Sequence, residues 1–294
     1  MTDAPGNSRK LTVEDHSRDA ANLRYVYPVV SRRARGVSVG INLNPNNACN
    51  WACVYCQVPD LVRGAAPQID LDLLVEELTG FLDEVAGPVT GPEWMEQHAP
   101  PEARRLNDIA FSGNGEPTTV ADFEAVVAEV LRIRDGYEAL TPTKTVLITN
   151  GSRIHAGHVQ RGLERMASAN GEVWFKLDSA TPAGRASING STAPLERVLQ
   201  NLRTSAETCR TLIQTCAFGR NSAAPTDAET AAYLDLLTSE VERGTPIAGV
   251  LLYGLARPSL QPAAPELFRL EDGWIQSFAE RIRGATGLPV EAHA

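Results

Sequence analysis

The sequence predicts an α/β fold in which helices cover a single parallel sheet. Short apolar runs alternate with amphipathic helical stretches along the chain, and this alternation favours parallel strands joined by right-handed crossovers. The run 146–148, Val-Leu-Ile, is apolar at every position, which is typical of a parallel strand covered on both faces. Hydrophobic residues make up 43% of the 294 residues, enough to fill one large core or two small ones.

Strand–helix pairs account for most of the chain. Leu74 and Leu78 stand one helical turn apart in the first expected helix. Thr226 precedes Asp227 and Glu229 in a later one, where a hydroxyl cap and acidic side chains stabilise the first turn. The expected strands are residues 37–44, 108–113, 145–150, 172–179, 211–218 and 248–254. The expected helices are residues 70–85, 120–133, 158–168, 194–206, 227–243 and 271–286.

The ends of the chain and one long connection depart from this pattern. We expect residues 1–36 to form an N-terminal extension and residues 37–294 to form the main domain. The N-terminus lacks the apolar core of a signal peptide, and no apolar run is long enough to cross a membrane, so we expect a cytoplasmic protein. Residues 87–106 are rich in proline and predict a long irregular loop, either a surface insertion or a cover for a functional site.

The charge of the chain argues against a large contact with nucleic acid. The formal net charge is −9, whereas proteins that hold nucleic acid usually present a basic surface. Arg32, Arg33 and Arg35 form a local basic patch, which we interpret as a solvated stretch of surface.

Three of the five cysteines, Cys49, Cys53 and Cys56, follow the spacing C-x3-C-x2-C. Thiolates are soft ligands that suit iron–sulfur clusters, zinc or Cu(I). Their sulfurs converge only where the backbone curls, and the turn-forming residues 44–47 (Asn-Pro-Asn-Asn) suit such a loop. A structural zinc site needs four ligands, and His98 lies far away in the sequence. Disulfides are disfavoured in a cytosolic chain, so the spacing favours an iron–sulfur cluster.

The stretch CNWACVYC, with Tyr55 before the last cysteine, resembles the cluster loop of the radical S-adenosylmethionine (radical SAM) superfamily. The resemblance continues to residue 258 through the motifs FSGNGEPT, LITNGS, FKLDSA and LYGLARP. It implies an α/β (β/α)6 partial TIM barrel, a [4Fe–4S] cluster on the three cysteines, and S-adenosyl-L-methionine (SAM) on the iron without a protein ligand. It also implies an enzyme that cleaves SAM reductively to a 5′-deoxyadenosyl radical, which abstracts hydrogen from a substrate.

The ends of the strands supply the expected SAM contacts, because ligands of parallel α/β folds bind beyond the carboxyl ends of strands. The segment 112–118 resembles the glycine-rich segment that binds the SAM amino group, with Glu116 accepting from the ammonium. By the same resemblance Asn150 and Asp178 contact the ribose and Lys176 the methionine carboxylate; the alternative for the last two is an ion pair. Arg257 is expected at the barrel mouth. The expected cofactor contacts are Tyr55, Gly113, Gly115, Glu116, Asn150, Lys176, Asp178 and Asn221.

The motifs look most like the group that contains the wyosine-forming tRNA enzymes, but the chain lacks their second cysteine cluster or flavin domain. Cys209 and Cys216 are too few for a second cluster, and we interpret Cys216 as a core residue. With the acidic charge, this favours a small molecule or a peptide over tRNA as the substrate. The expected electron source is a carrier such as flavodoxin or ferredoxin.

Two further expectations concern the site as a whole. The alternative to an enzyme is a non-catalytic iron–sulfur or metal-binding module on the same fold, which has no need of Glu116, Asn150 and Asp178. A cluster that forms radicals needs shielding from water and oxygen. We expect the segment 87–106 with Trp94, or the N-terminal extension with Tyr25, to lie over the cluster-side opening.

Overall fold

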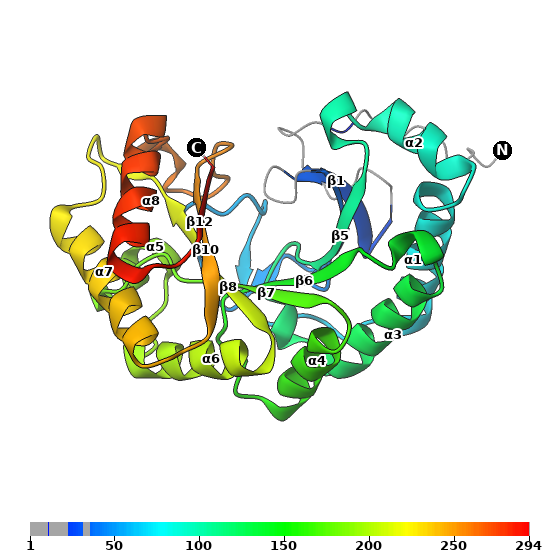
Figure 1. Ribbon diagram of the computed structural model, residues 1–294, viewed down its shortest axis with the longest axis horizontal. Coiled ribbons are helices and arrows are strands. Elements are labelled where there is room, and N and C mark those ends of the chain that lie inside the picture. The colour runs from blue at the N-terminus through cyan, green and yellow to red at the C-terminus, as the bar shows by residue number, and fades with distance from the viewer. Residues whose placement is uncertain (1–10, 12–22, 32–35, 294) are drawn as a thin grey trace.

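The computed structural model describes residues 11, 23–31 and 36–293, in which one curled sheet of eight strands carries helices on its outer face (Figure 1). The strand order is β1-β2-β5-β6-β7-β8-β10-β12. All neighbouring pairs are parallel except β1 and β2, which are antiparallel. The edge strands β1 and β12 do not pair with each other, so the sheet is an open half-barrel.

The α/β expectation is confirmed, but the described sheet has two more strands than expected. Strand β1 lies in the expected N-terminal extension, and β12 lies beyond the last expected helix. The strands of the sheet are β1 (Val26–Ser31), β2 (Gly36–Ile41), β5 (Leu106–Phe111), β6 (Lys144–Thr149), β7 (Gly171–Lys176), β8 (Arg210–Ala217), β10 (Ile247–Gly254) and β12 (Val290–His293). Two small pairs join β3 (Ala48–Cys49) to β4 (Val62–Arg63) and β9 (Gly219–Arg220) to β11 (Leu267–Phe268).

The helices form the outer layer of the half-barrel (Figure 1). Asp70 caps the first helix by accepting from Leu73 N, and Thr226, as expected, caps α7 by accepting from Glu229 N. The helices are α1 (Leu71–Val85), α2 (Thr90–His98), α3 (Phe123–Asp135), α4 (Gly157–Ala167), α5 (Pro182–Asn189), α6 (Leu195–Thr208), α7 (Asp227–Glu242) and α8 (Asp272–Thr286). Short 3-10 turns span Pro101–Ala103, Pro117–Thr119, Glu138–Leu140 and Ala264–Glu266. None of the described helices is both long and apolar enough to span a membrane.

The segment 87–106 is not an irregular loop, and of the two expected roles, a cover or a surface insertion, it does not fit the cover. It forms α2, which packs on α1, and Trp94 lies edge-on to Phe81 with 5.7 Å between ring centroids. Trp94 and Met95 are both buried in the main core. Proline is tolerated in the first turn of a helix, which is where Pro92 lies. The two large apolar side chains therefore fill the outer layer, away from the mouth of the half-barrel.

The described part of the expected N-terminal extension belongs to the sheet. Glu77 of α1 accepts hydrogen bonds from the backbone N–H groups of Arg24 and Tyr25, at 2.8 Å each, and fixes the start of β1. Tyr25 is fully buried, and its hydroxyl accepts from Asp70 N. It therefore packs in the core and does not cover the cluster-side opening, as the sequence had suggested. The patch of Arg32, Arg33 and Arg35 lies outside the described residues.

The inner face of the sheet carries the side chains that form the site. Side chains of paired residues on neighbouring strands lie on the same face of a sheet. Lys176 pairs with Gln214, and Gln214 with Leu251. One step further toward the carboxyl ends, Cys216 pairs with Tyr253. A small apolar cluster fills part of the same inner face; it comprises Ala110, Val146, Trp174, Leu212 and Leu251.

Candidate functional site

A cavity of about 270 Å³ opens on the inner face of the half-barrel. Cys49, Cys53 and Cys56 all line it, together with the glycine-rich segment that follows β5. The carboxyl ends of the parallel strands supply the rest of the wall, as expected for an α/β fold. Sequence-distant motifs are thus brought to one place.

The loop that carries the cysteines is bonded to distant parts of the chain. Ala52 N donates to Asn189 O at 2.9 Å, and Val54 N to Ile188 O at 2.8 Å, so the end of α5 holds one side of the loop. On the other side, Ser259 Oγ donates to Val54 O at 2.7 Å. The backbone of the loop is therefore fixed by its surroundings without a bound group.

Burial affects the thiols of this loop strongly. It raises the pKa of Cys49 to about 12 and the pKa of Cys53 to about 11. Two N–H groups already point at these sulfurs: Trp51 N donates to Cys49 Sγ at 3.4 Å, and Asn189 Nδ2 donates to Cys53 Sγ at 3.3 Å. Lys176 lowers the pKa of Cys53 only in part, whereas a metal ion bound directly to the sulfurs would favour the thiolate form.

The donor set fits an iron–sulfur cluster better than a single ion. Three free thiols share the cavity, and thiolates are the ligands of iron–sulfur clusters. Among the described residues no group of three or more Cys, His, Asp or Glu side chains is gathered in a way that could hold a single metal ion. A closed four-ligand zinc site is thus not preformed in this part of the chain.

The glycine-rich segment lies against the cysteine loop. A Cβ on Gly115 would come within 2.0 Å of Ala48 O, and a Cβ on Gly113 within 2.4 Å of Asn42 Oδ1. Gly113 also has φ of +145°, which L side chains rarely adopt. Asn114 Nδ2 donates to Asn47 Oδ1 at 2.6 Å. Only glycine allows the two loops to approach this closely.

Glu116 lines the cavity and holds two strand ends together. Its Oε1 accepts from the hydroxyls of Thr118 and Thr149, and its Oε2 accepts from Asn150 N at 2.6 Å. Burial raises the pKa of Glu116 in spite of these bonds. Because Oε2 accepts one bond among the described residues, it retains capacity for another donor, such as an ammonium group.

Asn150 directly follows β6 and is hydrogen-bonded to the cysteine loop. Its Nδ2 donates to Asn50 Oδ1 at 2.8 Å, and its Oδ1 accepts from Ser152 N at 3.0 Å. The side chain is 5% exposed and lines the cavity. Asn150 therefore points toward the cysteines, but most of its carboxamide is already hydrogen-bonded.

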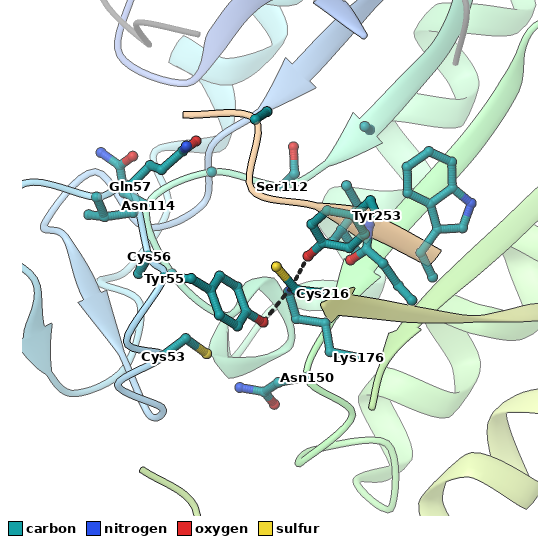
Figure 2. Close-up of a pocket in the computed structure, with 18 of the residues that line it drawn as sticks. Cys53, Tyr55, Cys56, Gln57, Ser112, Asn114, Asn150, Lys176, Cys216 and Tyr253 are labelled. Carbon is teal, nitrogen blue, oxygen red and sulfur yellow. Dashed lines mark hydrogen bonds between the residues drawn. The ribbon is translucent and has the colours of Figure 1, made fainter. Parts of the chain in front are cut away.

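Lys176 stands between two tyrosine hydroxyls in the cavity (Figure 2). Its Nζ lies 3.2 Å from Tyr55 Oη and 3.1 Å from Tyr253 Oη. Burial alone would lower the pKa of Lys176, but Tyr253 and Asp178 raise it above its usual value. Lys176 is thus a cation at neutral pH and favours an anionic group in the cavity.

Two of the expected contacts do not line the cavity. Asp178 lies behind Tyr55, and its carboxylate accepts from Asn189 Nδ2 at 2.7 Å and from Cys216 N at 2.8 Å. Asn221 is exposed beyond β9, where its N–H donates to Glu266 O at 2.8 Å. Both remain predictions as SAM contacts, although Asp178 acts on the cavity through Tyr55. Arg257 does line the cavity, as expected of a residue at the mouth.

The structure adds wall residues that sequence reasoning missed. Gln214, Tyr253 and His293 line the cavity, and so does Cys216, which we had interpreted only as a core residue. Gln214 had a visible signal: it is a polar residue at an inward position of an otherwise apolar strand, two residues before Cys216. His293 had none, because its strand is a short polar edge.

Solved structures of known proteins share this architecture. A crystal structure of a radical SAM methyltransferase from Sphaerobacter thermophilus matches 92% of this chain and 68% of its own, with a TM-score of 0.58 and 17% identity. The chain has the fold of a radical SAM enzyme. At this level of identity the likeness establishes the fold and leaves the reaction open.

A second neighbour with the same fold is SuiB from Streptococcus suis. Its structures alone and bound to the precursor peptide SuiA match 90% and 85% of this chain, with TM-scores of 0.54 and 0.53 and identities of 10% and 12%. The chain covers 51% and 48% of the SuiB chains in these structures, so it spans about half of that protein.

Part of the sequence is similar to that of a curated protein. A GTPase Obg from Brachyspira hyodysenteriae is 27% identical over 139 residues, which are 46% of this chain and 17% of that protein. No lysine of this chain follows a glycine, so it contains no P-loop of the form G-x4-G-K-[ST]. No family model matches the chain.

Proposed function

We propose that this protein is a radical SAM enzyme in which Cys49, Cys53 and Cys56 hold a [4Fe–4S] cluster. When bound and reduced, the cluster would supply the electron that cleaves SAM, giving a 5′-deoxyadenosyl radical that abstracts hydrogen from a substrate. The observation that carries the proposal is that the three cysteines and the glycine-rich segment line one cavity. The fold shared with a radical SAM methyltransferase supports it.

The residues of the chain would divide the work of binding SAM. Lys176 provides a buried positive charge for the carboxylate of the methionine part. Glu116 Oε2 offers an acceptor for the ammonium, and Gly113 and Gly115 of the same segment line the cavity beside it. Tyr55, from the cysteine loop, packs against Phe218 with 5.6 Å between the ring centroids. Its ring would shield the cluster from water.

The alternative, a non-catalytic iron–sulfur or metal-binding module, is less well supported. Such a module has no need of a second set of polar groups beside its cysteines. Here Asn150 is bonded to Asn50 within the cysteine loop, and Glu116 is bonded to Asn150. These side chains face the cysteines, as a SAM pocket requires.

The substrate we propose is a small molecule or a peptide, and not tRNA. The net charge of −9 disfavours a polyanion, and a structural neighbour, SuiB, has been solved with a precursor peptide. The electrons would come from a carrier such as flavodoxin or ferredoxin, and the working place we propose is the cytoplasm.

The proposal is tested by anaerobic reconstitution with iron and sulfide, followed by dithionite reduction and addition of SAM. We expect visible cluster absorption and release of 5′-deoxyadenosine. The variant Cys49→Ala/Cys53→Ala/Cys56→Ala is expected to show neither, whereas Cys209→Ala, a buried cysteine outside the cavity, is expected to behave like the wild type. Clusters without SAM cleavage would favour the non-catalytic module, and equal iron in the triple variant would exclude the cysteine assignment.

A further inference from the structure

Gln214 is a buried polar side chain that lacks a hydrogen-bond partner among the described residues. It is 0% exposed, and neither Nε2 nor Oε1 of its carboxamide has a hydrogen-bond partner among the described residues. It lines the cavity. Leaving such a group unpaired disfavours the folded state, and buried polar groups in proteins are nearly always paired. Its partner is therefore something that enters the cavity.

Gln214 lies deeper in the half-barrel than most of the proposed SAM contacts. Gly113, Glu116 and Asn150 follow the ends of their strands, whereas Gln214 lies inside β8, which ends at Ala217. Lys176, at the end of β7, is the exception, because it pairs with Gln214. Gln214 pairs with Lys176 on β7 and with Leu251 on β10, so it lies deeper in the half-barrel than Cys216.

The surroundings of Gln214 combine an apolar wall with Lys176 on the paired strand and with a hydrogen-bonded pair, Ser38 and Asp108. Ala110, Ile148 and Trp174 line the same cavity. Trp174 Nε1 donates to Glu172 Oε1 at 2.7 Å, so its N–H is already used. Ser38 Oγ donates to Asp108 Oδ1 on the β2–β5 part of the wall. An occupant of this region therefore meets an apolar surface, the ammonium group of Lys176 and the carboxamide of Gln214, which has no partner among the described residues.

We propose that the deep end of the cavity binds a planar, neutral amide, with Gln214 as the residue that recognises it. The free carboxamide offers one donor edge and one acceptor edge, and an amide group presents the complementary acceptor and donor in one plane. A carboxylate would leave Gln214 Oε1 unpaired, and an ammonium would leave Nε2 unpaired. Any water that occupies the space in the free protein is displaced by the amide.

The amide belongs either to a small ring compound or to an Asn side chain of a peptide, and the chemistry of recognition is the same. Calling this occupant the substrate rests on the proposed radical SAM function. Its binding does not, because Gln214 contacts neither the cysteines nor SAM in this assignment. Binding and SAM cleavage are therefore measured separately on the same preparation.

The test uses the full chain and three probes of matched shape: benzamide, benzoate and acetophenone, measured by ligand-observed NMR and calorimetry. We expect benzamide to bind at least about tenfold more tightly than the other two, since a paired amide gains two hydrogen bonds that acetophenone and benzoate cannot both make. The tripeptide Ala-Asn-Ala against Ala-Asp-Ala provides the peptide arm. A preference for an amide in either arm supports the inference and identifies its source.

Gln214→Met is the deciding variant, because it keeps the length of the side chain and removes the unpaired group. We expect it to abolish the preference for the amide and to raise the urea midpoint of unfolding, whereas a residue kept for structure would lower it. Gln276→Met, at an exposed position of α8, is the control and should change neither. Equal affinity of the wild type for all probes, or an unchanged preference in Gln214→Met, would overturn the inference whatever the result of the SAM cleavage assay.

Discussion

The hydroxyl of Tyr55 donates to Asp178 Oδ2 at 2.5 Å, which bonds the cysteine loop directly to the segment after β7. The same hydroxyl lies 3.2 Å from Lys176 Nζ. Tyr55 comes just before Cys56, and it is buried. The place of the loop over the cavity therefore depends on a residue from the other side of the half-barrel.

Replacing Tyr55 by Phe removes this bond and keeps the ring. Asp178 retains its bonds from Asn189 and Cys216, so we expect a loss of about 1–3 kcal/mol in the free energy of unfolding. We also expect the reconstituted protein to lose iron faster in air, and the decay of its visible absorption measures this loss. Tyr137→Phe, which removes a hydroxyl bonded to Asp83 on the surface, is the control. Iron loss at the same rate in both variants would contradict the role of Tyr55.

Gly115→Ala tests the contact between the glycine-rich segment and the cysteine loop. The added Cβ would stand 2.0 Å from Ala48 O, so one of the two loops must move. Overpacking of this kind costs about 1–3 kcal/mol, and we expect weaker SAM binding in an anaerobic titration. Gly80→Ala has no atom within 4 Å of its Cβ and lies inside α1, so it should stabilise the protein by about 0.5–1 kcal/mol. Normal SAM affinity in Gly115→Ala would show that this approach is not needed.

Glu116→Gln separates a direct SAM contact from a positioning role. The change removes the charge and places an N–H group against a donor, Asn150 N or one of the threonine hydroxyls. We expect the affinity for SAM to fall about tenfold to a hundredfold, corresponding to about 1.5–3 kcal/mol, with the iron content unchanged. If Glu116 acts only by holding Asn150, the urea midpoint falls as well. Unchanged affinity would remove Glu116 from the site.

Glu240 provides a pH-dependent test of the outer layer. Burial would raise its pKa, but hydrogen bonds from Arg203 and Thr245 outweigh this and lower the pKa below its usual value. The stabilisation is therefore present above the unfolded-state pKa, near 4.3, and is lost as pH falls through the lower folded-state pKa. We expect Glu240→Gln to cost about 1.5–3 kcal/mol at neutral pH and little in acid. Urea midpoints at both pH values measure this.

Glu129→Gln is the control for that experiment. Its carboxylate pairs with the exposed Arg132 on the surface of α3, at 2.8 Å. Exposed pairs of this kind contribute less than about 1 kcal/mol. If the urea midpoint changes equally with pH in both variants, the Arg203–Glu240 pair does not contribute more than an exposed surface pair.

The parts of the fold that the sequence predicted are those buried on both faces. Strand β6 contains the apolar run 146–148, so its position in a parallel sheet follows from composition. The edge strands β1 and β12 were missed because an edge tolerates Pro28 in one and polar residues in the other. Helix α2 was missed because its proline was taken as a loop signal.

The candidate site divides in the same way. The cysteine spacing and the glycine-rich segment are local patterns, and the structure brings both to one cavity. Asp178 accepts a hydrogen bond from the Tyr55 hydroxyl and does not line the cavity. These two residues are 123 positions apart, so no local spacing in the sequence predicts their contact. The sequence likewise does not show that the carboxamide of Gln214 lacks a hydrogen-bond partner among the described residues, because this depends on the three-dimensional packing around it.

The anchoring of the cysteine loop sets an order of events during folding. Its bonds reach Asn189 at the end of α5 and Ser259 beyond β10, the latter across 205 residues of sequence. Contacts between such distant residues close large loops and form late, after the intervening strands have paired. If the three cysteines hold the proposed cluster, their loop reaches its final place only after most of the sheet has assembled, so iron would be taken up late in folding.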